Sequence, residues 1–243
     1  MLEMTEDYGF CCYESLKRYI LLKTLFVTDI SQEISNFLEE MENPACFRVE
    51  FVAQKLSGYL FQDEFNRNAE MFDLSEIKFA EFLLSRCIRL CKEPDPPYFS
   101  FLLVAAFLKE SVFHFFLKYK CFRILYIADF CLDILYDRVF FEVFESRDFY
   151  DNLKLFCEDF FNRFSSDSTS SPLQDTAFGN YWFHIVNERL NVIDDSFSLD
   201  EIEEVFQEVY SLESLGKREV WSILRETENA ESAYFDAKKL LSF

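Results

Sequence analysis

Glycine and proline are scarce in this chain, with 4 and 5 copies in 243 residues. All-β sandwiches and barrels need a turn roughly every 8–12 residues, and such turns draw on both residue types. Phosphate loops and dinucleotide-binding motifs need closely spaced glycines, whereas the glycines here lie far apart, at positions 9, 58, 179 and 216. The shortage therefore excludes those nucleotide motifs and disfavours a β architecture.

Basic residues are also in short supply. The chain has 24 Lys and Arg against 44 Asp and Glu, which gives a net charge of −20. A field of this sign repels phosphate, so we expect no direct nucleic-acid binding and no adhesion to anionic membranes. The charge favours a basic protein partner, although acidic surfaces also simply keep proteins soluble.

Residues that bind metals or perform catalysis form no recognisable set. The only histidines are His114 and His184, and the eight cysteines contain no Cys-x-x-Cys pair. A structural zinc site needs four convergent ligands, usually in close pairs. Because no secretory signal opens the chain, we expect reduced, buried thiols and an intracellular location, cytoplasmic or nuclear. We expect no metal, no cofactor and no enzymatic activity, and both histidines are predicted to be hydrogen-bonded in a core or an interface.

Three aspartates at helical spacing, Asp129, Asp133 and Asp137, form the one pattern that suggests a metal site. Helical trans-prenyl synthases hold magnesium diphosphate with aspartates at such spacing. On a helical wheel, however, the three fall within about 80° of one another, opposite the apolar residues of the segment. The sequence therefore predicts a solvated helix face, and inward-pointing aspartates would instead favour an enzyme.

Aromatic residues are abundant, with 32 Phe and 12 Tyr, and half of the chain is hydrophobic. The sequence leaves open whether the excess of Phe reflects core, interface or codon bias. The longest uncharged run in the hydrophobic middle of the chain covers residues 98–108 and ends at Lys109 and Glu110. A membrane span needs about 20 apolar residues, so we predict a buried helix and no membrane span.

Apolar residues recur at helical spacing along most of the chain. The fold class that follows is all-α, a multi-helical array or irregular bundle of short antiparallel helices. HEAT/armadillo-like stacking of helical pairs also fits. The predicted helices cover residues 10–27, 31–42, 46–62, 73–92, 98–119, 121–137, 138–147, 149–164, 177–190, 198–212, 217–228 and 231–243.

A Ser-rich stretch at residues 165–176 has no apolar periodicity and is predicted to be a linker. It divides the chain into a helical array at 1–164 and a smaller, acidic C-terminal helical unit at 177–243. Ser171 precedes a proline within the linker, the minimal context of a proline-directed kinase, and is therefore a candidate regulatory site.

Residues 191–215 contain eight acids and no base. We expect a non-enzymatic scaffold or adaptor that binds a protein partner through an inter-helix groove and this acidic C-terminal face. The alternatives are a helical enzyme without local motifs, using dispersed carboxylates or a cysteine, and an obligate subunit of a larger complex. The predicted partner-binding residues are Asp194, Asp195, Asp200, Glu201, Glu204 and Glu208.

Overall fold

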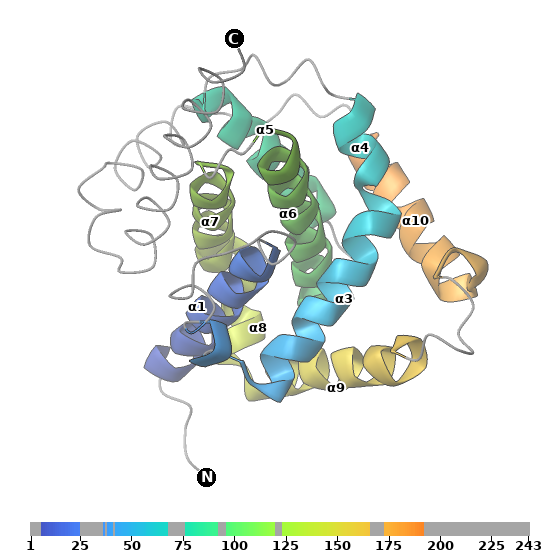
Figure 1. Ribbon diagram of the computed structural model, residues 1–243. Coiled ribbons are helices and arrows are strands. Elements are labelled where there is room, and N and C mark those ends of the chain that lie inside the picture. Colours follow the sequence, from blue (N-terminus) through green and yellow to red (C-terminus); the bar gives the residue numbers. More distant parts are fainter. Residues whose placement is uncertain are drawn as a thin grey trace.

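A computed structural model describes residues 6–24, 36, 38–40, 42–67, 76–91, 96–119, 123–165 and 173–191. Within these ranges all regular structure is helical, which confirms the all-α prediction (Figure 1). Stacking of helical pairs stays a prediction. The elements are α1 (Glu6–Lys23), α3 (Pro44–Leu60), α4 (Gln62–Arg67), α5 (Glu76–Leu90), α6 (Pro97–Tyr119), α7 (Arg123–Leu135), the π-helical turn η3 (Tyr136–Phe140), α8 (Phe141–Glu145), α9 (Arg147–Phe164), the 3-10 turn η4 (Leu173–Asp175) and α10 (Ala177–Leu190).

Helix α6 is the central element. It is apolar on all sides, and every residue from 101 to 112 is buried, as expected for a helix without a solvent face. Helices α1 and α7 lie on one side of it and α3 on the other (Figure 1). Its segment Pro97–Phe116 has the length and composition of a membrane span, and 83% of that window is buried inside the protein. The prediction of a buried helix is confirmed.

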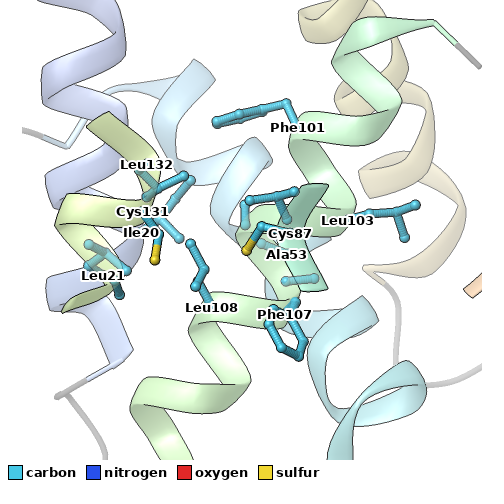
Figure 2. Packing of buried hydrophobic residues seen from close by; sticks show 14 of the residues in the cluster. Ile20, Leu21, Ala53, Cys87, Phe101, Leu103, Phe107, Leu108, Cys131 and Leu132 are labelled. Atoms are coloured by element: carbon cyan, nitrogen blue, oxygen red, sulfur yellow. The ribbon is translucent and has the colours of Figure 1, made fainter. Parts of the chain in front are cut away.

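Figure 2 shows how the other helices send apolar side chains toward α6. The labelled residues come from α1 (Ile20, Leu21), α3 (Ala53), α5 (Cys87), α6 (Phe101, Leu103, Phe107, Leu108) and α7 (Cys131, Leu132). A second group of rings joins α6, α9 and α10. There the Trp182 ring lies 3.9 Å from that of Phe99 and 6.2 Å from that of Phe156. In the described residues, much of the aromatic excess thus fills the interior.

At the start of α10 the backbone at Gly179 lies very close to the carbonyl group of Leu173. Thr176 Oγ1 accepts a hydrogen bond from the Gly179 amide (2.9 Å) and donates one to the Leu173 carbonyl (2.7 Å). A Cβ atom on Gly179 would lie 1.9 Å from that same carbonyl oxygen. Only glycine therefore fits at this position.

Two arginines join α10 to α5 reciprocally. Arg189 Nη1 donates to the Leu90 carbonyl at the end of α5 (2.7 Å), and Arg86 Nη1 donates to the Leu190 carbonyl at the end of α10 (2.8 Å). A cation at a helix C-terminus satisfies unpaired carbonyls and complements the helix dipole. Helix α10 therefore shares the core of the preceding helices, while the rest of the predicted C-terminal unit, from residue 192 onward, lies outside the described residues.

Several predicted helix boundaries need correction. The expected break between residues 137 and 138 is wrong, because the helix continues through η3 to Glu145. No Gly or Pro occurs between 123 and 145, and a π-helical turn absorbs an extra residue without ending a helix. Helix α3 begins two residues earlier than predicted because the Asn43 side chain caps the Ala45 and Cys46 amides and proline suits the first turn.

Other boundaries differ less or fall outside the described residues. Helix α1 begins at Glu6, four residues before its predicted start. The short helix α4 after Phe61 was not predicted as a separate element. Of the predicted helix 31–42, residues 36, 38–40 and 42 are described; residues 36 and 38–40 are helical, and residue 42 is not.

Candidate functional site

The aspartates singled out by the sequence meet a lysine of α1. The Lys17 side chain is 0% exposed, and its ammonium lies 2.8 Å from Glu14 Oε1 and 3.0 Å from Asp129 Oδ1. It also donates a hydrogen bond to Asp133 Oδ1. Three carboxylates thus surround one buried cation between α1 and α7.

The predicted solvated face of α7 is therefore wrong in part. Asp129 is 3% exposed and Asp133 is half-buried, whereas Asp137 is exposed as predicted. A helical wheel identifies the polar side of a helix but not what packs there. Here α1 covers that side with Lys17, which supplies the opposite charge that the buried Asp129 and the half-buried Asp133 require.

The charges in this cluster determine its protonation. Burial alone would lower the pKa of Lys17, but Asp129, Asp133 and Glu14 together raise it above its ordinary value. Burial and the neighbouring Asp129 raise the pKa of Asp133 to about 6, against the opposing effect of Lys17. A protonated lysine is neither a nucleophile nor a base. Its ammonium also occupies the position that a metal ion would need among the carboxylates.

No metal site emerges elsewhere in the part of the chain that the structure describes. Within those residues, no group of three or more His, Cys, Asp or Glu side chains is placed to hold a metal ion.

A second buried ion pair links α3 and α6. Lys109 Nζ lies 2.9 Å from Glu50 Oε1 and donates a hydrogen bond to Thr24 Oγ1 at 3.2 Å. Burial lowers the pKa of Lys109 and raises that of the adjacent Glu110. Lys109 and Glu110, the two charges that interrupt the apolar run, are therefore both buried. Their partners are Thr24, just after α1, and residues of α3.

Among the described cysteines and histidines, the structure singles out no Cys–His pair that could act as a nucleophile. Cys87, Cys131 and Cys157 are buried, and burial raises the pKa of Cys157 to about 12. A thiol in such an environment stays protonated and unreactive. His114 is half-buried beside the Phe65 ring. His184 is exposed on α10, so a core position is wrong for that histidine.

A surface hollow of about 380 Å³ lies between the start of α3 and the middle of α9. We call it the α3–α9 groove. Two ion pairs line it, Arg48 with Glu158 at 3.2 Å and Lys154 with Asp151 at 2.6 Å. At the groove Leu155 is 67% exposed, the most exposed of the large apolar side chains described. The lining residues are Ala45, Arg48, Asp151, Lys154, Leu155, Cys157 and Glu158.

The local sequence explains the groove. The apolar side of α9 packs inward through Leu153, Cys157 and Phe160, and the Phe47 and Phe51 rings of α3 rest on Phe161 at 5.7 and 5.0 Å. Smaller or charged residues follow on both helices toward solvent, which leaves space between the two backbones.

Sequence reasoning did not identify this groove. The available signal was Leu155, an apolar residue on the polar side of an otherwise amphipathic helix. The predicted site residues lie elsewhere in the chain. Asp194, Asp195, Asp200, Glu201, Glu204, Glu208 and Ser171 all lie outside the described residues.

Comparison with known proteins gives no match to any family model, any curated protein or any solved structure.

Proposed function

We propose that this protein is a non-enzymatic helical scaffold or adaptor that binds another protein through the α3–α9 groove. The observation that supports this most is Leu155, which is 67% exposed beside a hollow of about 380 Å³. A partner that covers this leucine gains the free energy of burying its side chain, roughly 1–2 kcal/mol.

The lining of the groove favours a protein segment over a small molecule. Small-molecule sites are lined mainly by apolar and aromatic side chains around a few polar groups. Here four of the seven lining residues are charged, and they are paired with one another. An amphipathic helix in a groove needs an apolar anchor and flanking charges that fix its orientation, and Leu155 with these ion pairs supplies both.

The acidic stretch that contains Asp194 to Glu208 is proposed as a second contact, suited to a basic partner. With a net charge of −20, the chain repels phosphate backbones and anionic lipids. We therefore propose a protein partner and no direct nucleic-acid or membrane binding. The free thiols of the described cysteines favour a reducing, intracellular location.

The ionisable groups of the interior support a structural role for the carboxylates. Lys17 and Lys109 each neutralise carboxylates from another helix, and both lysines are buried. Charges that neutralise one another in the interior depend on each other, because removal of one partner leaves the other buried and unpaired. The rival enzyme hypothesis therefore gains no support from the inward-facing aspartates.

Capture of partners with a groove variant tests the proposal. The tagged full chain is purified from cells alongside Leu155→Glu and the control Asn180→Glu, a substitution at an exposed position of α10. We expect a stoichiometric protein that the wild type and the control retain and Leu155→Glu loses. A set of bound proteins that is identical for all three chains would contradict the groove as the binding site.

A further inference from the structure

The charges along the groove side of α9 alternate in sign. Arg147, Asp151, Lys154 and Glu158 follow one another at spacings of three or four residues, so they lie along one side of the helix. Their side chains are 73%, 44%, 40% and 48% exposed. This set, which we call the α9 charge row, is therefore available to a partner despite its intramolecular pairs.

The α9 charge row is complementary to its own reverse. Read from the C-terminal end, the order plus, minus, plus, minus becomes minus, plus, minus, plus. Consider a second α9 that lies antiparallel to the first, with the twofold axis between residues 152 and 153. Arg147 of each copy then faces Glu158 of the other, and Asp151 of each copy faces Lys154 of the other. A parallel copy in register would place like charges opposite each other, which is destabilising.

We propose that the partner in the α3–α9 groove is a second copy of this chain, with the two α9 helices antiparallel and their charge rows paired. This inference rests on the proposed function, because it names the occupant of the same groove. The groove carries two acids and two bases, so its lining does not select a strongly basic ligand. Another α9 complements the α9 charge row charge for charge, and that row shares Asp151, Lys154 and Glu158 with the lining. A twofold contact of this kind is the commonest arrangement of homo-oligomers.

The proposed contact has a further consequence for Leu155. The leucine lies near the twofold axis, so the partner helix covers it in both copies at once. The charge of −20 on each chain opposes association at long range, and a Debye length of about 8 Å at physiological salt limits that repulsion. We therefore expect a weak dimer, with a dissociation constant on the order of tens of micromolar.

Sedimentation of the full chain at physiological salt tests the proposal. The contact between residues 151 and 154 occurs twice in the symmetric dimer. Lys154→Glu and Asp151→Lys each place like charges at both copies of this contact, and we expect each variant to weaken dimerisation about tenfold or more. Mixing the two variants makes every one of these contacts attractive again. We therefore expect association in the mixture that neither variant shows alone. Restoration cannot come from the intramolecular pair, which is broken in both chains.

A matched control is Arg163→Glu, which changes the charge as Lys154→Glu does and breaks an exposed ion pair of α9 with Asp159. Because Arg163 lies off the charge row, we expect dimerisation to be unchanged, and circular dichroism verifies the helix content of every variant. A chain that stays monomeric up to several hundred micromolar, or a dimer that the mixture does not restore, would overturn the proposal. If the chain does not dimerise in this way, the capture experiment still tests the proposed function separately. A different protein that the wild type binds and Leu155→Glu loses would support binding through the groove by a partner other than a second copy.

Discussion

Lys17 of α1 and Asp129 of α7 form an ion pair across 3.0 Å, with both side chains removed from water. Glu14 and Asp133 complete the shell around the same ammonium. Two charges pay a desolvation penalty on burial, so such a pair adds little net stability, but removal of one partner leaves the other uncompensated. Asp129 and Asp133 therefore depend on Lys17, whereas Glu14 also pairs with Arg18 at 3.2 Å.

Replacement of Lys17 with methionine keeps the length of the side chain and removes its charge. We expect the free energy of unfolding to fall by roughly 3–5 kcal/mol, because buried carboxylates lose their counter-charge. Urea unfolding at neutral pH measures the change. Lys154→Met, at an exposed pair, is the control and should cost at most about 1 kcal/mol. Equal losses for the two variants would show that the Lys17 cluster has no special role.

Protonation of Asp133 makes stability depend on pH. Its pKa is raised from 3.8 to about 6 in the folded protein, so the folded state binds the proton more tightly than the unfolded state does. The stability from this group is therefore present at pH below 3.8 and is lost as the pH rises to about 6. Asp129, Glu14, Lys17 and Tyr13 all face this carboxylate or lie within its electrostatic reach.

Asp133→Asn removes this titration. We expect the stability of the wild type, measured relative to Asp133→Asn, to fall by roughly 1–3 kcal/mol between pH 4 and pH 6.5. Denaturant unfolding of both proteins across this range gives the difference, in which the other groups largely cancel. A difference that is flat or rises with pH would contradict the raised pKa.

Gly58 and Gly179 both lie in helices, but their replacement with alanine is expected to change the stability in opposite directions. An alanine Cβ at Gly179 would lie 1.9 Å from the Leu173 carbonyl oxygen, whereas nothing lies within 4 Å of a Cβ at Gly58. We expect Gly179→Ala to destabilise the protein by roughly 1–3 kcal/mol. Gly58→Ala should stabilise it by about 0.5–1 kcal/mol through helix propensity. Thermal unfolding of both variants measures the pair, and the same sign for both would refute this description of the α10 start.

The thiols provide a test of the non-enzymatic proposal. Burial raises the pKa of Cys87, Cys131 and Cys157, so we expect these residues to stay unmodified by iodoacetamide in the folded protein and to react in urea. The half-exposed Cys12 is the internal reference and should react before these three. Peptide mass mapping identifies each site. Rapid labelling of one of the three buried thiols in the folded chain would favour the cysteine-enzyme alternative.

Local patterns predicted those parts of the fold that depend on nearby residues. The scarcity of glycine and proline indicated helices, and the uncharged run at 98–108 indicated the buried centre of α6, both of which the structure confirms. The helix boundary at 137 and 138 could not be predicted, because a π-helical turn depends on how Tyr136 and its neighbours pack and not on a residue that breaks helices.

The interior ion pairs could not be predicted because they join distant parts of the chain. Lys17 and Asp129 are more than a hundred positions apart. Lys17 has apolar neighbours at helical spacing on α1, Tyr13, Ile20 and Leu21, which indicates that it points inward, but no local pattern identifies its partner. The α3–α9 groove presented the same difficulty, since it depends on how α3 and α9 pack together. The one local indication of this surface was Leu155, an apolar residue on the polar side of α9.

The central claim is that the α3–α9 groove is the binding surface and that a second α9 occupies it. Hydrogen exchange of the full chain, compared at about 5 µM and about 300 µM, tests this most directly because self-association depends on concentration. We expect slower exchange at the higher concentration in α9 and in the first turn of α3, with unchanged rates in α5. Identical exchange at both concentrations, or protection confined to other helices, would contradict it.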